Sequence, residues 1–263
     1  MSNSIAVGIA VDAGNVAEGI IEGKVFLADK PYEWTSFNVV SKIRNYCRRV
    51  TGLKKIKVGH AGTLDPLATG LLLVATGKMT KQIDSLQAKE KEYTGTFVLG
   101  QTTESYDLEK PVVNSGSYDG LTSDDIYAAA TRLTGIIMQV PPVFSAVKID
   151  GKRAYEYGRS GKDVEISAKQ IEVREFEITR IALPEVDFRI VCSKGTYIRA
   201  IARDFGDILG CGAYLSALRR TRIGEYNVAN AIGLDIFGSN VDRNRDNSPS
   251  HLRFADNLIK HNE

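Results

Sequence analysis

The chain has 263 residues, of which 43% are hydrophobic and 25% charged, an ordinary globular composition. Its 34 Lys and Arg nearly balance 32 Asp and Glu, so the net charge of +2 indicates no class of partner by itself. The three cysteines are far apart without CxxC spacing, which argues against a disulfide framework or a zinc site. No apolar run approaches the roughly 20 residues of a membrane span, and the first twenty residues contain no Lys or Arg, unlike a secretory signal. We therefore expect a cytoplasmic protein without a membrane segment.

The first part of the chain predicts an extension, a strand and a basic helix. Residues 1–21 are expected to be a weakly structured extension, and the apolar run from Lys24 to Ala28 predicts a strand that stops at Pro31. Thr35 or Ser36 can then cap a helix to about Val50, with an apolar face made by Phe37, Val40, Ile43, Cys47 and Val50. Positive charge continues from this helix towards the next loop, at Lys42, Arg44, Arg48, Arg49, Lys54, Lys55 and Lys57. These cations form either a solvated surface or a site for phosphate contacts.

Residues 58–78, VGHAGTLDPLATGLLLVATGK, combine a glycine-rich loop with an apolar run that predicts a buried strand or helix. Pro66 biases Asp65 towards extended backbone geometry. No other acidic residue lies between Glu33 and Asp84, so the Asp65 carboxylate should stay ionised beside the cations and face an anionic partner. The alternative is that Asp65 only caps a helix or turn.

The middle of the chain predicts a strand, an acidic loop and a helix. Residues from Tyr93 to Leu99 alternate as in a half-buried strand, where a tyrosine is ordinarily a core residue. Residues 104–120 suit a surface loop, and Thr122 or Ser123 would cap a helix through Thr131 with Tyr127 and Leu133 facing inward.

The second half of the chain predicts a basic loop, a strand and a helix. The stretch 141–162 is basic and aromatic, typical either of a loop that binds RNA or of a solvated hairpin. Residues 186–192 alternate as a strand that leads to a helix from Tyr197 to Leu209. Arg199 and Arg203 lie one turn apart there and could form surface ion pairs.

Several motifs together resemble one family. GHAGTLDPLATGLL resembles the signature of the TruB family of tRNA pseudouridine synthases. Four more stretches are similar to family motifs: VFLADKPYEWTSF at 25–37, KEYTGTFVLGQTTESYD at 91–107, PPVFSAVKIDGKRAYEYGRSG at 141–161 and CSKGTYIRAIARDFGDILGCGAYLSALRR at 192–220. The resemblance implies the α+β pseudouridine synthase fold, a large mixed, mostly antiparallel sheet with flanking helices and a central catalytic cleft. That domain would span 22–232, and the tail at 233–263 is too short for the PUA RNA-binding domain of many family members.

The resemblance also implies roles for single residues. Asp65 would be the catalytic nucleophile, and Arg199 would pair with it and keep it charged. Tyr93 would stack on the uracil and could help to remove its C5 proton, while Tyr197 and Leu218 would line the pocket. His60 would occupy the space that the flipped base leaves. Candidate RNA contacts are Arg44, Arg48, Lys55, Lys57, Lys81, Lys148, Lys152 and Arg153.

The implied reaction is isomerisation of the uridine at position 55 in the T loop of tRNA, without metal or cofactor. Asp65 could attack C1′ or C6 or take a ribose proton, and the sequence does not choose among these. The expected partner is the T arm of tRNA, with no obligatory protein partner and a monomeric enzyme, and an added role in tRNA folding is compatible with the basic patches. Alternatives are a guide-RNA-dependent synthase, a pure RNA chaperone and a general RNA-binding module.

Overall fold

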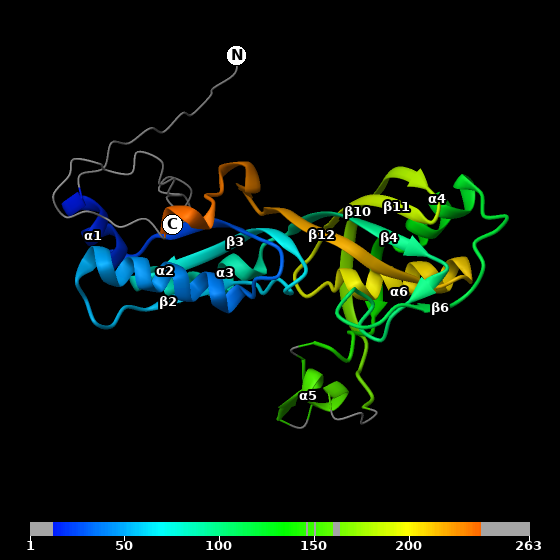
Figure 1. The fold of residues 1–263 in the computed structure, drawn as a ribbon, viewed down its shortest axis with the longest axis horizontal. Helices are drawn as coiled ribbons and strands as arrows, with labels where there is room; N and C mark the ends of the chain where they lie inside the picture. The colour runs from blue at the N-terminus through cyan, green and yellow to red at the C-terminus, as the bar shows by residue number, and fades with distance from the viewer. Residues whose placement is uncertain (1–12, 146, 150, 160–163, 238–263) are drawn as a thin grey trace, which may run out of the picture. The chain divides into compact units, whose positions relative to one another are not determined.

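The computed structural model describes residues 13–145, 147–149, 151–159 and 164–237. The chain forms two compact units, shown in Figure 1. Unit 1 comprises the chain up to Gln87 together with the chain from Arg222 onward, and unit 2 comprises Ala88–Thr221. Within the described part, no helix has the length and apolar character needed to cross a membrane.

Unit 1 alternates helices with short strands. Its elements are α1 (Ala13–Glu22), β1 (Val25–Lys30), α2 (Ser36–Thr51), β2 (Val58–Ala61), β3 (Thr69–Thr76), η1 (Gly77–Gln82), α3 (Ile83–Ala88), β13 (Tyr226–Asn227), η2 (Val228–Asn230) and η3 (Leu234–Phe237). Strand β3 pairs antiparallel with both β1 and β2. Because Thr35 caps α2 through a capping box with Asn38, the helix begins where the sequence predicts.

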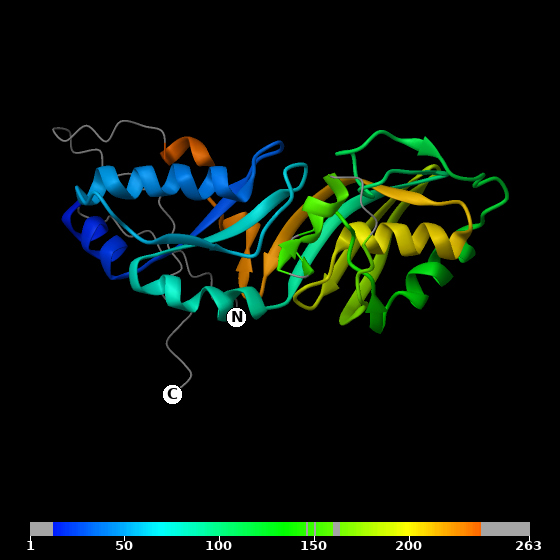
Figure 2. The same ribbon diagram turned by 90° about the horizontal axis from the view of Figure 1, so that it is seen from below.

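Strands β1 and β3 are covered on both faces, as Figure 2 shows for α2 and α3. Phe26 and Leu72 belong to the core cluster with α1, α2 and η3. Leu27 and Leu71 belong to a second cluster, which includes Leu86 of α3. A strand buried on both faces needs apolar residues at every position. This explains why β3 is a continuous apolar run.

Helix α1 forms where the sequence suggests a weakly structured extension. Its Val16 and Ile20 are buried in the core of unit 1. The Thr76 hydroxyl donates a hydrogen bond to the Ile20 carbonyl over 3.1 Å. Helix α2 packs over these apolar residues. Because this contact joins two separate helices, the local sequence pattern of residues 13–22 does not reveal it. Residues 1–12 of the expected extension lie outside the described residues.

Unit 2 is built on long antiparallel strands. Its elements are β4 (Lys91–Leu99), β5 (Gln101–Thr102), β6 (Val113–Asn114), α4 (Ser123–Arg132), β7 (Gly135–Gln139), β8 (Lys148–Ile149), β9 (Lys152–Arg153), α5 (Ala154–Arg159), β10 (Lys169–Ala182), β11 (Glu185–Cys192), α6 (Ile198–Leu209) and β12 (Ala213–Ile223). Strand β11 pairs antiparallel with β4 and β10, and β10 pairs with β7. The α+β class and the mostly antiparallel sheet are therefore as predicted.

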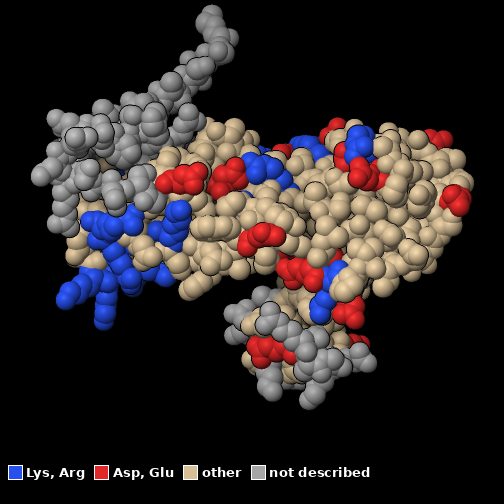
Figure 3. All heavy atoms as spheres, in the orientation of Figure 1, with Lys and Arg blue, Asp and Glu red and all other residues tan. Residues whose placement is uncertain are grey.

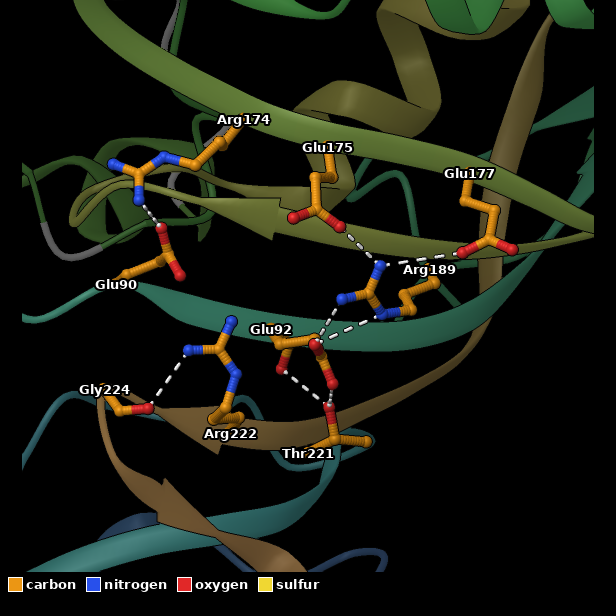
Figure 4. A network of polar contacts seen from close by, with 9 residues as sticks. All are labelled: Glu90, Glu92, Arg174, Glu175, Glu177, Arg189, Thr221, Arg222 and Gly224. Carbon is orange, nitrogen blue, oxygen red and sulfur yellow. Dashed lines mark hydrogen bonds and ion pairs between the residues drawn. The ribbon is translucent and has the colours of Figure 1, made fainter.

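The two faces of the unit 2 sheet differ in character because successive strand residues point to opposite sides. On one face the rings of Phe97 and Phe188 stack with centroids 4.2 Å apart, and Phe205 of α6 lies against Phe97. On the other face Arg189 bonds to Glu92 at 2.7 Å and Glu175 at 2.6 Å, as Figure 4 shows. The aromatic face is the core, and the charged face is the partly exposed surface.

Two residues predicted to face the core do not. Phe37 is 67% exposed and Tyr127 is 50% exposed. Val39, Val40 and Ile43 lie on the buried side of α2. Successive helix residues are rotated by about 100°, which places Phe37 about 120° away from the middle of this buried side. These two predictions are wrong because a three- and four-residue spacing defines the position of a buried stripe only loosely.

Candidate active site

Asp65 lies in the turn between β2 and β3, which we call the Asp65 loop (residues 62–68). Its side chain is half-buried, and the Ala68 amide donates to the Asp65 carbonyl over 3.1 Å. Gly62 has φ 93° and Gly70 has φ 102°, a region that disfavours residues with a Cβ. The glycines on either side of Asp65 therefore permit the tight path of this loop.

A buried lysine holds one side of the Asp65 loop. Lys30, at the end of β1, is fully buried. Its ammonium donates to the carbonyl of Pro66 over 3.0 Å and to that of Pro31 over 3.0 Å. A third bond reaches the Trp34 carbonyl. Lys30 therefore fixes the residue that follows Asp65, a role that our sequence reasoning missed although a lysine inside an apolar strand is a visible signal.

A serine holds the other side of the same loop. The Ser36 hydroxyl donates to the Leu64 carbonyl over 3.1 Å and accepts from the Leu64 amide over 2.9 Å. Ser36 is itself buried in the first turn of α2. The residues immediately before and after Asp65 are thus both bonded to side chains of the segment 30–37, which runs from the end of β1 into the first turn of α2. This anchoring favours a single backbone position for the carboxylate.

The guanidinium of Arg199 is buried in unit 2 and contacts a carboxylate and two backbone carbonyls there. Its Nε lies 3.5 Å from Asp107 Oδ2, with both side chains 6% exposed. Its Nη1 donates to the Ser105 carbonyl over 3.2 Å and its Nη2 to the Phe144 carbonyl over 2.9 Å. Because Arg199 is on α6, these contacts tie that helix to two loops. The pairing of Arg199 with Asp65 of unit 1 stays a prediction.

Asp107 is a candidate site residue that our sequence reasoning did not single out. Its Oδ1 accepts from the Ser105 hydroxyl and, over 3.0 Å, from the Glu109 amide. Ser105 and Asp107 are 0% and 4% exposed, so this part of the predicted surface loop is buried. The acidic composition of residues 104–120 gave no sign that one carboxylate turns inward to meet an arginine 92 positions further along.

The predicted pocket residues of unit 2 lie on three different elements. Tyr93 is on β4, paired with Ile190 of β11 and 8% exposed. Tyr197 is the N-cap residue of α6, and its backbone amide and carbonyl both bond to the Gln139 side chain, over 2.9 and 3.2 Å. Leu218 is half-buried on β12. In unit 1, His60 is on β2.

The candidate RNA contacts divide into structural and exposed cations. Arg44 donates to the Val58 carbonyl over 3.1 Å and so links α2 to β2. Arg48, Lys55 and Lys57 are exposed, together with Lys54. Figure 3 shows Lys and Arg gathered over α2 and the loop after it.

The remaining candidates lie on η1 and in the basic stretch of unit 2. Lys81 is exposed on η1. The backbone of Lys148 pairs with that of Arg153, and Ile149 pairs with Lys152, in a short hairpin followed by α5. The basic stretch thus forms a hairpin and a helix rather than an irregular loop.

The described residues offer neither a metal-binding cluster nor a reactive thiol. Among them, no cluster of three or more His, Cys, Asp or Glu side chains could hold a metal ion. All three cysteines are buried and free. Burial raises the pKa of the Cys47 and Cys192 thiols to about 12, which keeps them protonated and poorly nucleophilic at neutral pH.

Comparison with known proteins decides the family. Residues 48–198 match the TruB family pseudouridylate synthase (N terminal domain), and residues 199–254 match the tRNA pseudouridylate synthase B C-terminal domain. The chain belongs to the TruB family. A relative from Flavobacterium johnsoniae named tRNA pseudouridine synthase B is 52% identical over 221 residues, which cover 84% of this chain and 96% of the relative. A relative of the same name from Phocaeicola vulgatus is 50% identical and covers 84% and 94%.

Solved structures agree with this TruB assignment at the level of the fold. A chain in the crystal structure of a Cbf5-Nop10-Gar1 complex is 29% identical, with a TM-score of 0.64. The match covers 89% of this chain and 59% of that chain.

Proposed function

We propose that this TruB chain is a tRNA pseudouridine synthase that isomerises the uridine at position 55 in the T loop. The proposal is supported by the relatives named tRNA pseudouridine synthase B, of which this chain covers 96% and 94%. The main structural support is the Asp65 loop, in which Lys30 and Ser36 hold the residues immediately after and before Asp65. A nucleophile must be held in one geometry to react with a positioned nucleotide.

The chemistry suits one carboxylate. Pseudouridine formation breaks the bond between uracil N1 and ribose C1′, turns the base and joins C5 to C1′, with no net change in redox state. Glycosidases generally use two carboxyl groups because a sugar alkoxide leaves poorly, whereas uracil leaves as a delocalised anion. Asp65 acts by attack on C1′ or C6 or by removal of a ribose proton.

The residues of unit 2 would orient the reaction. Arg199 would keep the Asp65 carboxylate charged and aimed, and Asp107 would hold the Arg199 guanidinium. Tyr93, Tyr197 and Leu218 would enclose the uracil, with Tyr93 placed to help in removing the C5 proton. A nucleotide in a stacked loop must be flipped out to reach such a pocket.

Other residues would bind the rest of the RNA. His60 would fill the space that the flipped base leaves. The exposed cations of unit 1, with Lys81, Lys148, Lys152 and Arg153, would bind phosphates of the T arm. We further propose a cytoplasmic monomer that needs no obligatory protein partner.

The test is tritium release from an unmodified tRNA transcript labelled at uracil C5. Wild type should release about one tritium per tRNA from the T loop, and Asp65→Asn should reduce the rate by roughly 10³-fold or more. Asp65→Asn should still bind the transcript, because the substitution leaves the basic surface intact. Binding by wild type without any release would overturn the enzymatic proposal in favour of an RNA chaperone or a guide-dependent enzyme.

A further inference from the structure

Two exposed aromatic side chains lie on the segment that anchors the Asp65 loop. Tyr32 is 49% exposed in the turn after β1, and Phe37 is 67% exposed in the first turn of α2. Neither contributes to the two core clusters of unit 1. Single exposed aromatic residues are common on proteins. Two of them lie five positions apart on the segment that bonds the residues before and after a candidate nucleophile, and this placement suggests a function.

The hydrogen bonds of this segment fix both aromatic residues relative to Asp65. Tyr32 lies between Pro31 and Trp34, whose carbonyls share the Lys30 ammonium with the carbonyl of Pro66. Phe37 follows Ser36, whose hydroxyl bonds both backbone groups of Leu64. Figure 2 shows the turn after β1 beside the loop between β2 and β3. The aromatic residues and the carboxylate therefore share one hydrogen-bonded framework within unit 1.

The surroundings of the aromatic pair suit an anionic polymer with flat bases. The Lys42 ammonium lies 5.5 Å from the centre of the Trp34 ring. Exposed cations lie at the C-terminal end of α2 and in the loop after it. Glu33 is the one acidic residue between Tyr32 and Phe37, and it is exposed with φ 64°. Proteins bind unpaired nucleotides by combining aromatic side chains with basic ones, since every base has a face that can stack.

We propose that Tyr32 and Phe37 form a stacking platform for unpaired RNA bases next to the target nucleotide. The platform rests on the proposed function, because it takes the RNA loop presented to Asp65 as its ligand. It stabilises the bound loop after the target base has left its stack. The gain is in RNA affinity, and it is independent of the chemical step.

Binding measurements separate this platform from the cationic surface. Stacking should weaken with salt far less than phosphate contacts, whose loss lowers the slope of log K against log salt. In the Asp65→Asn background, Phe37→Ala and Tyr32→Ala should each weaken binding of an unmodified tRNA transcript by about 5- to 150-fold with an unchanged salt slope. Phe37→Trp should retain the affinity, and Phe37→Leu should lose it despite similar apolar character. Fluorescence anisotropy over a salt series measures all four.

The matched control is Tyr127→Ala, which removes an exposed tyrosine of α4 in unit 2. It should leave RNA affinity unchanged, and thermal unfolding should show all variants folded. Unchanged affinity in folded Phe37→Ala and Tyr32→Ala would overturn the platform, as would a Phe37→Leu protein that binds like its parent.

Tritium release by the same aromatic variants with Asp65 restored separates the platform proposal from the proposed enzymatic function. If wild type releases no tritium but RNA binding still depends on Tyr32 and Phe37, only the enzymatic proposal is refuted. If wild type releases tritium but RNA binding does not depend on these two residues, only the platform is refuted.

Discussion

The Arg199 and Asp107 side chains form an ion pair that is shielded from solvent. Such a pair costs desolvation energy to bury, so it contributes little net stability, but removing one partner leaves an uncompensated charge that costs about 3–5 kcal/mol. Ser105 and the Glu109 amide bond the carboxylate in addition. The arrangement therefore serves to hold the guanidinium in one orientation more than to stabilise the fold.

Asp107→Asn tests this positioning role. The amide keeps an acceptor for Ser105 and the Glu109 amide but loses the charge opposite Arg199. We expect kcat for tritium release to fall by about 100-fold, because a misplaced orienting group costs that much, while the Kd for tRNA stays within about twofold. Single-turnover rates and anisotropy provide the two numbers. An unchanged kcat in the folded variant would contradict the role, and partial recovery in Asp107→Glu would support it.

Lys91 is a second buried cation, at the start of β4 and 5% exposed. Burial, reinforced by the nearby charge of Arg220, lowers the pKa of its ammonium to about 8. An unfolded lysine has a pKa of about 10.4. Between these values the unfolded chain holds a proton that the folded chain has released, so the free energy of unfolding rises with pH.

The comparison of wild type with Lys91→Met should reveal this titration. The free energy of unfolding of wild type should rise relative to the variant by up to about 3 kcal/mol between pH 8 and 10.4. Below pH 8 the difference should stay constant. Urea unfolding of both proteins from pH 7 to 10 measures it, and parallel pH curves would show that Lys91 has an ordinary pKa in the fold.

At the scale of helices and strands, the sequence predicted the elements whose apolar residues recur at regular spacing. It did not predict the contacts between segments that are far apart in the chain. Strands β1, β4 and β11 and helices α2, α4 and α6 begin and end within about two residues of their predicted bounds, because alternation, capping residues and glycine are local signals. Asp65 and Arg199 came from motif resemblance. Lys30, Ser36 and Asp107 act on residues 28 to 92 positions away, and that pairing exists only in three dimensions.

The pairing of β4 with its neighbours imposes a strict limit on side-chain volume at Gly95. A Cβ there would lie 2.3 Å from the Ala217 carbonyl oxygen and 2.7 Å from the Phe188 ring. Since backbone cannot move aside cheaply, Gly95→Ala should destabilise the protein by about 1–3 kcal/mol.

Gly233→Ala is the matched control, because a Cβ added at Gly233 would meet no atom of the described residues within 4 Å beyond its own chain neighbours. It should change the free energy of unfolding by less than about 1 kcal/mol. Urea unfolding of both variants measures the two effects. Equal stabilities would mean that β4 and β12 can separate at this point without loss.

At the scale of the whole molecule, net charge conceals an uneven distribution. Unit 1 exposes Arg48, Lys54, Lys55 and Lys57 close together in the chain, with no acidic residue among them. Local positive potential of this kind steers a polyanion to one surface even when the overall charge is nearly zero. Figure 3 shows this surface over α2.

Replacing Lys55 and Lys57 together by Ala should lower the salt slope of tRNA binding. Each lost phosphate contact reduces the slope of log K against log salt by about 0.7 to 0.9, so the double variant should lose about 1.5. Lys169→Ala, which removes an exposed lysine of β10, should leave the slope unchanged. If the double variant keeps the wild-type slope of log K against log salt, as Lys169→Ala should, then residues other than Lys55 and Lys57 bind the RNA phosphates.

The order of the two units along the chain has a consequence during translation. The core of unit 1 includes Ile232, Leu234 and Phe237, which pack with Phe26 and Tyr46. A ribosome must therefore synthesise all of residues 88–221 before that core can close, which takes roughly 7 to 27 seconds at about 5–20 residues per second. Throughout this interval the apolar run of β3 has been synthesised but lacks part of its cover. The nascent chain should then depend on chaperones or on rapid docking of α1 and α2 to stay soluble, whereas unit 2 can fold as soon as its last strand emerges.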